Sequence, residues 1–287
     1  MGLFNTLQLI STHPLNRSAR GAALTRFIHW QLSSRLAPGP VMIPWVGGTS
    51  LLTRAGDQGL TQNLYCGLQE FEEMAFVLHL LRPQDWFMDV GANAGAYSVL
   101  AGGSCGASGV AVEPVPDTFA RLSMQLRVNG LEGRVKTVNA GCSDREGHMW
   151  FSTARDCLNS VVDENFPGPK LSLPISTVDI LAGEQTPRWM KIDVEGHDQW
   201  VLRGAKTVLA RPELWALVIE VTRSGATTEI LAEQGFIPCD YDPFGRRLTQ
   251  GNWADVKDGN VIAVRDFDGV SRRLAEAKPF EVLGKRI

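Results

Sequence analysis

Two short runs of glycine and acidic residues contain most of the groups that could perform chemistry in this sequence. The first run is Asp89-Val-Gly-Ala-Asn-Ala-Gly95, which overlaps an apolar run that begins at Trp86 and precedes a segment with helical spacing. A strand, a glycine turn and a helix open an α/β unit, in which helix N-terminal N–H groups and a turn without side chains let a ligand approach the main chain. We therefore expect Gly91 and Gly95 to line a ligand site.

The residues around this loop predict which ligand it binds. A dinucleotide fingerprint, G-x-G-x-x-G, would require glycine at two positions where this chain has Asn93 and Ala96. Asp89 would repel a diphosphate, whereas a carboxylate attracts a cationic amino-acid head group such as that of S-adenosylmethionine. Glu113 closes the next apolar run, and an acidic side chain there can accept hydrogen bonds from both ribose hydroxyls. The pattern therefore favours S-adenosylmethionine over a dinucleotide.

The second run is Lys191-Ile-Asp-Val-Glu-Gly196, which lies at the end of the fourth major strand that we expect. Because the carboxyl ends of parallel strands meet at one edge of a sheet, Asp193 and Glu195 should face the ligand bound at the glycine loop. Two carboxylates so close together cost electrostatic energy unless a cation, a metal or a hydroxyl group uses them. We place Asp193 near the ammonium or methyl group of the cofactor and Glu195 near an acceptor hydroxyl. Lys191 either steadies a carboxylate or lies at the surface.

A hydroxyl acceptor needs a base, because an aliphatic hydroxyl barely ionises at neutral pH. His197 is a candidate because imidazole titrates in the range that suits a general base, although a histidine here could instead cap a helix or lie at the surface. A magnesium ion that helps to deprotonate a diol is an alternative, with ligands drawn from Asp193, Glu195, His197 and Asp198. A strand-to-helix bend separates Asp193 from His197 and nothing fixes a third ligand, so we predict no metal.

From position 69 onward, strand and helix signals alternate along the chain. Such alternation predicts an α/β fold with a mostly parallel sheet and helices on both faces. Strands are expected at 86–90, 109–113, 135–140, 188–194, 214–221, 236–240 and 260–265. Helices are expected near 70–81, 96–102, 116–129, 197–210 and 225–235. An insertion over 147–177 should add short strands near 149–153 and 171–175 at the ligand edge of the sheet, and Asp242-Pro-Phe-Gly245 should form a turn.

The first 68 residues predict a separate front piece. A helical segment over 22–36 ends at the breaker Pro38-Gly-Pro40, and the runs 41–46 and 50–54 flank two glycines, as the strands of a β-hairpin do. The helix could lie at a membrane surface, but packing onto its own domain or onto a partner chain is commoner. We therefore expect a helix and hairpin cap over 1–68 and a catalytic domain over 69–287. The extension could also hold homo-oligomer contacts.

The composition is that of an ordinary globular protein. The 287 residues are 44% hydrophobic and carry a formal net charge of −3, which gives no electrostatic footprint for nucleic acid. The five cysteines are scattered and form no C-x-x-C pair, which favours reduced, buried thiols over a zinc site or a disulfide framework. No stretch approaches the ~20 apolar residues that span a bilayer, and the start lacks a basic flank before a long apolar core. We expect a cytoplasmic protein without a transmembrane segment.

Taken together, the loop 89–98, Glu113-Pro114, Thr177-Val-Asp179 and Lys191-Ile-Asp-Val-Glu-Gly196 resemble the FkbM family of S-adenosylmethionine-dependent methyltransferases. The resemblance extends from about Glu70 to Val221 and implies a Rossmann-like class I methyltransferase fold with a seven-stranded sheet whose last strand runs antiparallel. It also implies a set of cofactor contacts, namely Glu70, Asp89, Gly91, Asn93, Gly95, Tyr97, Ser98 and Glu113, with Ser143 and Asp144 near the adenine. Asp198 stands where this family often has glutamate, which leaves its role open.

FkbM proteins typically methylate hydroxyl oxygens of natural products, sugars or glycolipids. The resemblance therefore implies an O-methyltransferase whose acceptor is a hydroxyl of such a small molecule. Two alternatives come from other classes of protein. One is a nicotinamide- or sugar-nucleotide-binding Rossmann enzyme, which the missing fingerprint disfavours. The other is a non-catalytic partner protein with the methyltransferase fold, which the presence of Asp193 and Glu195 disfavours.

Overall fold

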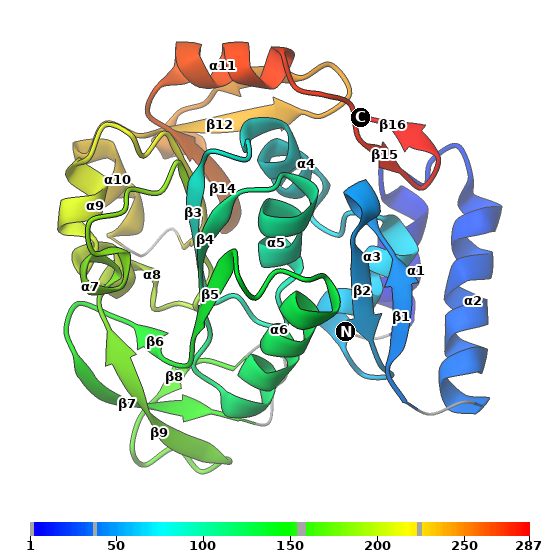
Figure 1. The fold of residues 1–287 in the computed structure, drawn as a ribbon, viewed down its shortest axis with the longest axis horizontal. Helices are drawn as coiled ribbons and strands as arrows, with labels where there is room; N and C mark the ends of the chain where they lie inside the picture. The colour runs from blue at the N-terminus through cyan, green and yellow to red at the C-terminus, as the bar shows by residue number, and fades with distance from the viewer. Residues whose placement is uncertain (1–2, 37–38, 154–158, 223–225) are drawn as a thin grey trace.

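The computed structural model describes residues 3–36, 39–153, 159–222 and 226–287, and a central eight-stranded sheet organises it (Figure 1). Its strands are β3 (Trp86–Val90), β4 (Ser108–Val112), β5 (Val135–Val138), β10 (Trp189–Ile192), β11 (Ala216–Val221), β12 (Ile237–Asp242), β13 (Arg247–Gln250) and β14 (Gly259–Val264). They lie in the order β13-β12-β14-β11-β10-β3-β4-β5. Strands β5, β4, β3, β10 and β11 are parallel, and β14 runs antiparallel to β11 and β12. The expected parallel sheet with a reversed last strand is thus confirmed.

All seven predicted strands are present, and their ends differ from the predicted ones by at most two residues. The prediction of seven strands was nevertheless wrong by one, because β13 pairs antiparallel with β12 at the edge of the sheet. Most of β13 is exposed, so its sequence lacks the apolar alternation that marks a half-buried strand. The predicted turn is correct: it joins β12 to β13, and the backbone N–H of Phe244 donates to Asp242 Oδ1 at 3.1 Å.

Alternate side chains of the central strands enter two apolar layers, one on each face of the sheet. Phe87 and Ala111 belong to the layer covered by α4 (Phe71–Leu80), α5 (Ala96–Val99), α6 (Pro116–Val128) and α11 (Phe267–Ala275). Met88 and Val110 belong to the layer covered by α7 (Val178–Ala182), α8 (Asp198–Arg203), α9 (Lys206–Ala210) and α10 (Thr227–Glu233). Figure 1 shows these two sets of helices on opposite sides of the sheet. This period of two follows from the pleat of a strand.

Two helices differ from their predicted form. The helix expected over 197–210 is divided into α8 and α9 at Gly204. A Cβ at Gly204 would lie 2.0 Å from the Ser143 carbonyl oxygen, so the chain passes there without a side chain. The helix expected over 96–102 is α5 followed by a π-helical turn, η2 (Leu100–Ser104). The predicted helix near 225–235 is α10, and its first expected residue lies outside the described residues. Helix α7 is short and was not predicted.

The insertion forms a second, smaller sheet at the lower left of Figure 1. Its order is β6-β9-β7-β8, with β6 (Gly141–Cys142), β7 (Gly147–Ser152), β8 (Val161–Val162) and β9 (Lys170–Ser176). Both predicted strands are present as β7 and β9, which pair antiparallel.

The N-terminal segment packs against the rest of the chain. It contains α1 (Leu3–Thr12), α2 (Arg20–Leu36), β1 (Val41–Pro44), a short turn η1 (Val46–Gly48), β2 (Ser50–Thr53) and α3 (Gln58–Cys66). The predicted hairpin is confirmed as β1 and β2, whereas α1 and α3 were not predicted. The hairpin is joined to α6 by the side chains of Asn129 and Gln125, which accept from the backbone N–H groups of Ser50 and Leu52 at 2.8 and 2.9 Å. A division of the chain at residue 68 stays a prediction.

The remaining elements lie near the C-terminus: η4 (Trp253–Asp255), β15 (Glu281–Val282) and β16 (Lys285–Arg286). Four cysteines are buried free thiols, as expected: Cys66, Cys105, Cys142 and Cys239. The fifth, Cys157, lies outside the described residues. None of the helices in the described ranges combines the length and the apolar character needed to cross a bilayer.

Candidate active site

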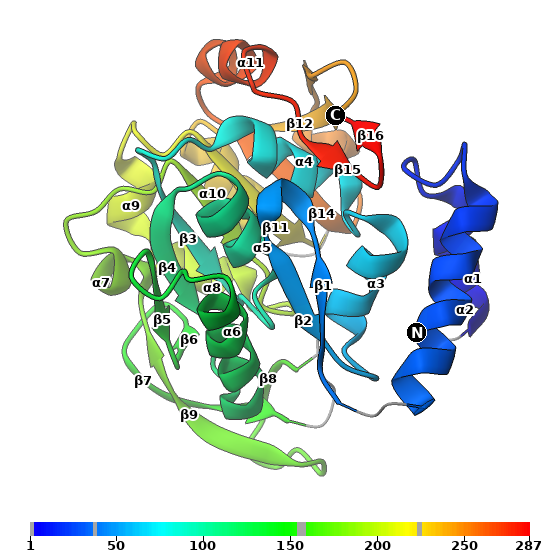
Figure 2. The same ribbon diagram turned by 45° about the vertical axis from the view of Figure 1, so that its right-hand side comes forward.

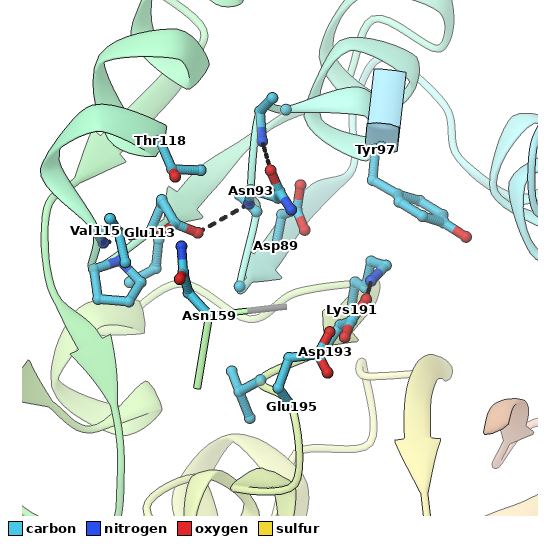
Figure 3. Close-up of a pocket in the computed structure, with 18 of the residues that line it drawn as sticks. Asp89, Asn93, Tyr97, Glu113, Val115, Thr118, Asn159, Lys191, Asp193 and Glu195 are labelled. Atoms are coloured by element: carbon cyan, nitrogen blue, oxygen red, sulfur yellow. Dashed lines mark hydrogen bonds and ion pairs between the residues drawn. The ribbon is translucent and has the colours of Figure 1, made fainter. Parts of the chain in front are cut away.

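Carboxylates from three neighbouring strands meet in one cavity. The cavity has a volume of about 420 Å³ and lies at the carboxyl ends of β3, β4 and β10, where Asp89, Glu113 and Asp193 line it (Figure 3). Its volume lies in the range of ordinary small-molecule sites. The predicted site residues in its lining are Glu70, Asp89, Gly91, Asn93, Gly95, Tyr97, Glu113, Asp193, Glu195 and His197. The structure thus brings most of the predicted residues together in one cavity, and Ser98, Ser143 and Asp144 are the three predicted residues outside its lining.

Asp89 presents a buried carboxylate oxygen that lacks a partner. The side chain is 1% exposed, and its Oδ2 accepts a hydrogen bond from the Ser98 hydroxyl at 2.6 Å. Its Oδ1 is buried and has no hydrogen-bond partner among the described residues. Burial raises the pKa of Asp89 above its usual value. A buried acceptor without a partner costs free energy, so this oxygen marks a place where a ligand could donate. Ser98 therefore orients Asp89 rather than lining the cavity itself.

The two loop glycines are required by contacts within the protein. Gly91 has a φ of +78°, and a Cβ on it would lie 1.9 Å from the Asp193 carbonyl oxygen. Gly95 has a φ of +90°, and its Cβ would lie 2.7 Å from Leu122 on α6. Our expectation that they keep a path open for the ligand was thus incomplete. Gly91 lets the ends of β3 and β10 approach each other, which brings Asp89 and Asp193 into one cavity.

Glu113 is held in place by backbone N–H groups from two segments of the chain. Its Oε2 accepts from the Asn93 N–H at 3.1 Å, and its Oε1 accepts from the Val115 N–H at 2.9 Å. Burial raises the pKa of Glu113 to about 7. Each carboxylate oxygen has two lone pairs, so both oxygens can accept a further hydrogen bond from a ligand. The fixed position agrees with the predicted role towards two ribose hydroxyls, which stays a prediction.

The pH dependence of stability should expose the buried Glu113. Its pKa of about 7 in the folded protein exceeds the ordinary 4.5, so between these values the folded state holds the extra proton and stability falls as pH rises. The unfolding free energy of Glu113→Gln minus that of wild type should therefore rise by on the order of 2–3 kcal/mol as pH goes from about 5 to about 8. Urea unfolding of the ligand-free proteins measures this difference.

The comparison uses the difference in unfolding free energy between wild type and Glu113→Gln, because other titratable groups also change the stability of both proteins with pH. Burial lowers the pKa of His13 and His79 to about 4, so the folded state favours their neutral forms. These two histidines therefore make the folded protein less stable as pH falls. They contribute equally to wild type and variant. If Glu113→Gln and wild type had parallel pH profiles, the buried-carboxylate assignment would be wrong.

Lys191 is a buried cation that neutralises part of the cavity. The residue is 4% exposed. Its Nζ lies 2.5 Å from Asp193 Oδ2 and 4.8 Å from the centre of the Tyr97 ring. Burial alone would lower the pKa of Lys191, but the charges of Asp193, Glu70 and Asp89 outweigh burial and raise it. Of the two roles considered for this lysine, steadying a carboxylate is the one that the structure supports.

Tyr97 and Glu70 complete this network. Burial, with the nearby Glu70 charge, raises the pKa of Tyr97, and the phenol donates to Glu70 Oε2 at 2.5 Å. The Tyr97 ring stacks on Trp189 with centroids 5.9 Å apart. Glu70 precedes α4, so the network ties this helix to β10 across the cavity.

Glu195 occupies a strained turn at the rim of the cavity. Its φ is +52°, in the left-handed region that residues with a side chain rarely adopt, and the next residue, Gly196, has a φ of +86°. Such strain is often found at functional sites. Burial, together with the charges of Asp193 and Glu220, raises the pKa of Glu195 to about 7. A carboxyl with this pKa is suited to accept a proton near neutral pH.

His197 and Asp198 have different surroundings. His197 lines the cavity, but its Nε2 lies 3.0 Å from the Ser143 hydroxyl oxygen and burial lowers its pKa, so the ring is engaged and neutral. Ser143 also donates to Asp144 at 3.2 Å, so Ser143 links the histidine to Asp144, and neither residue lines the cavity. Asp198 Oδ1 accepts from the Val194 N–H at 3.4 Å, which indicates a structural role at the start of α8.

Several cavity residues were not singled out from the sequence. Gln62 lies on α3, Thr118 on α6 and Phe151 on β7. No local signal marks them, because three distant segments supply them and the fold alone brings them together. The part of the chain that the structure describes holds no group of three His, Cys, Asp or Glu side chains placed to bind a metal ion.

The α/β sheet with a reversed last strand and the acidic cavity at its carboxyl edge define a methyltransferase of the class I fold. The family model of the FkbM methyltransferase domain matches residues 89–238, more than half of the chain. The chain therefore belongs to the FkbM methyltransferase family. This assignment confirms the predicted family, fold class and enzyme class.

One curated relative and two solved structures illustrate the similarity. The hexuronic acid methyltransferase AglP of Haloferax volcanii is 28% identical over 142 residues, which are 49% of this chain and 58% of that protein. The methyltransferase FkbM structure from Methylobacillus flagellatus KT has a TM-score of 0.45 at 14% identity, covering 85% of this chain and 60% of that one. A rRNA methylase from Streptococcus thermophilus has a TM-score of 0.40 at 13% identity, covering 67% and 93%.

Proposed function

We propose that this protein is an S-adenosylmethionine-dependent O-methyltransferase that acts on a hydroxyl of a small natural product, a sugar or a glycolipid. The observation that carries the proposal is the unpartnered, buried Asp89 Oδ1 in one cavity with Glu113 and Asp193. A cavity with several carboxylates and one buried lysine suits a ligand that brings positive charge and hydrogen-bond donors.

The residues present fit this cofactor. Asp89 and Asp193 would face its ammonium group and Glu113 its ribose hydroxyls, and both kinds of group can use oxygens that the protein leaves available. When bound, the cofactor supplies a methyl group on a sulfonium, which is an excellent leaving group. The protein then has to align the acceptor oxygen, exclude water and remove a proton.

Glu195 is the residue best placed to remove that proton. It lines the cavity, and its pKa of about 7 lets it accept a proton near neutral pH. His197 is the weaker candidate, because Ser143 already engages its Nε2. Lys191 holds Asp193 in place, and the Tyr97–Glu70 hydrogen bond closes the side of the cavity next to α4.

The acceptor is proposed to be a hydroxyl for an electrostatic reason. The relative from Haloferax volcanii is named for a hexuronic acid, a sugar that has both hydroxyl groups and a carboxylate. A carboxylate acceptor would enter a cavity already lined by Asp193 and Glu195 and would be repelled. A neutral hydroxyl avoids this repulsion.

The proposal also covers the cellular compartment of the protein and the kind of molecule that it binds. Buried free thiols suit a reducing compartment, so we place the enzyme in the cytoplasm. The net charge of −3 supports a small-molecule partner over nucleic acid.

Transfer of a labelled methyl group tests this proposal. The protein is incubated with methyl-tritiated S-adenosylmethionine and a panel of neutral sugars, hexuronic acids and glycolipids. The expected product is a methyl ether, which survives mild alkali. A product that alkali cleaves to methanol would be an ester and would overturn the hydroxyl assignment.

Substitution of Glu195 should separate chemistry from binding. Glu195→Gln removes the proposed base, so kcat should fall about 100-fold or more, while affinity for S-adenosylhomocysteine stays within about twofold. In wild type, kcat should rise with pH through about 7, because only ionised Glu195 can accept the proton. Steady-state kinetics across pH measure both effects. A His197→Asn variant is the comparison, and a larger loss there than in Glu195→Gln would transfer the role to the histidine.

A further inference from the structure

The first 56 residues have a charge distribution unlike that of the rest of the chain. They contain no Asp or Glu and five arginines: Arg17, Arg20, Arg26, Arg35 and Arg54. Without these five, the 28 Lys and Arg and 31 Asp and Glu of the whole chain leave residues 57–287 with a formal net charge of −8. The N-terminal segment is therefore cationic, and the remainder is acidic.

Helix α2 has an apolar stripe on its outward face. Leu24, Ile28, Leu32 and Leu36 are 43%, 48%, 58% and 84% exposed. They follow one another at intervals of four residues, which places successive members on one side of a helix. The opposite side of α2 is buried through Ala23, Phe27 and Trp30, which pack in a cluster with residues of α1 and α3. The stripe therefore does not serve to pack α2 onto its own protein.

Exposed apolar side chains are concentrated in this segment. Of the 13 large hydrophobic residues that are exposed in the described part of the chain, seven lie before residue 43: Phe4, Leu24, Ile28, Leu32, Leu36, Val41 and Met42. Scattered exposed hydrophobic residues are normal, but such a concentration in one segment, with four of the seven on α2, indicates an interaction surface. Figures 1 and 2 both show α2 at the outer edge of the molecule, away from the main sheet.

Two arginines lie beside the stripe. Arg20 and Arg35 are exposed, and each lies within one helical turn of a stripe residue. Arg26 is used within the protein, where it donates to Asn16 Oδ1 and to the Tyr65 carbonyl at 2.8 Å. Arg54 pairs with Asp57 at 3.3 Å. The surface of α2 thus combines an apolar stripe with positive charge and no carboxylate of its own.

We propose that this outward face of α2 docks on the surface of an anionic lipid bilayer. Apolar side chains flanked by arginines are the features that hold an amphipathic helix in the plane of an interface with anionic lipids. The charge of the rest of the chain sets the orientation, because an acidic body is repelled by an anionic surface while the cationic segment is attracted. A second copy docked through the same face would place Arg20 and Arg35 against their equivalents, which charge repulsion opposes.

Helix α3 lies between α2 and the candidate active cavity. It contacts the side of α2 opposite the stripe, and its Gln62 lines both that cavity and a neighbouring one of about 460 Å³ between α2 and α3. Docking would therefore place the bilayer on the α3 side of the active cavity, with α2 between them. If the proposed function holds, an acceptor attached to a lipid would be presented on this side. Binding to the bilayer itself does not require methyl transfer.

Vesicle co-sedimentation of the full chain tests the proposal without any methyl donor. Wild type should sediment with phosphatidylcholine vesicles that contain phosphatidylglycerol, should bind less when salt is added, and should bind weakly to phosphatidylcholine alone. Ile28→Asp/Leu32→Asp should weaken binding at least about 30-fold, because it places charge in the apolar contact. Arg20→Gln/Arg35→Gln should weaken it about 30-fold, since each arginine near an anionic surface contributes roughly fivefold.

Matched substitutions elsewhere control for a general effect of lost apolar surface. Leu171→Asp/Ile180→Asp alters residues that are 46% and 53% exposed on other elements, and it should bind as wild type does. Unchanged circular dichroism in every variant shows that folding is intact. Failure of wild type to bind anionic vesicles, or equal binding by Ile28→Asp/Leu32→Asp, would overturn the proposal. So would a wild-type dimer in light scattering that Ile28→Asp/Leu32→Asp dissociates, because the face would then bind a second copy.

Discussion

Gly91→Ala is expected to destabilise the protein by more than about 4 kcal/mol. Two costs add at this position. An alanine at a φ of +78° is strained by about 1–2 kcal/mol. Its Cβ would also lie 1.9 Å from the Asp193 carbonyl oxygen, so the end of β10 must move away from β3. Urea unfolding at equilibrium measures the loss.

Gly130→Ala has only the first of these costs, so the comparison with Gly91→Ala isolates the second. Gly130 has a φ of +66°, but no atom lies within 4 Å of a Cβ built on it. This variant should therefore lose only the ~1–2 kcal/mol of backbone strain. Equal losses for Gly91→Ala and Gly130→Ala would show that β3 and β10 do not approach as closely as the structure indicates. The joint placement of Asp89 and Asp193 would then lose its basis.

Lys191→Met should destabilise the protein by about 3–5 kcal/mol. The substitution keeps an unbranched chain of similar length but removes the charge that lies 2.5 Å from Asp193 Oδ2. The half-buried Asp193, whose side chain is 29% exposed, and the buried Asp89 both lose a neighbouring positive charge. A carboxylate in such surroundings keeps its desolvation cost without the compensating attraction. The loss should be smaller in mild acid, because Asp89, whose pKa is already raised, can then take up a proton. Thermal and urea unfolding at several pH values measure it.

Two further variants separate the ion pair from a packing effect. Arg127→Met breaks the pair with Glu132, whose side chains are 63% and 58% exposed, and should cost less than about 1 kcal/mol. Lys191→Met/Asp193→Asn removes both charges of the Lys191–Asp193 pair and should recover part of the loss. A loss in Lys191→Met no larger than in Arg127→Met would contradict a buried, charged Lys191.

The general position of the site could be predicted because its signals are local. Asp89, Glu113 and Asp193 each follow an apolar run, and the geometry of parallel strands brings the ends of such runs together. The glycines in the loop mark the turn in the same way, since positive φ favours glycine. These signals needed no knowledge of contacts between distant parts of the chain.

Features that depend on distant contacts could not be predicted. The sequence does not show that Lys191 is buried, because that depends on Tyr97 and Glu70 approaching from other elements. Gly204 cannot carry a side chain because Ser143, 61 positions earlier in the chain, lies against it. Strand β13 escaped prediction because an exposed edge strand needs little apolar alternation.

Ser143 and Asp144 lie beside the cavity but outside its lining. In the structure Ser143 contacts His197, and the place near the adenine that the resemblance implies for both residues stays a prediction. Ser98 is similar, because its hydroxyl supports Asp89 from outside the lining. Position in a motif identified the neighbourhood of these residues, and packing decided which atoms they contact.

Calorimetric titration with S-adenosylhomocysteine tests the central claim most directly. The account predicts that wild type binds one equivalent, and that Asp89→Asn weakens binding about 10- to 100-fold because the unpartnered Oδ1 no longer carries charge. Gly130→Ala, far from the cavity lining, should bind as wild type does. Absence of binding by folded wild type, or an Asp89→Asn variant with unchanged affinity, would contradict the account.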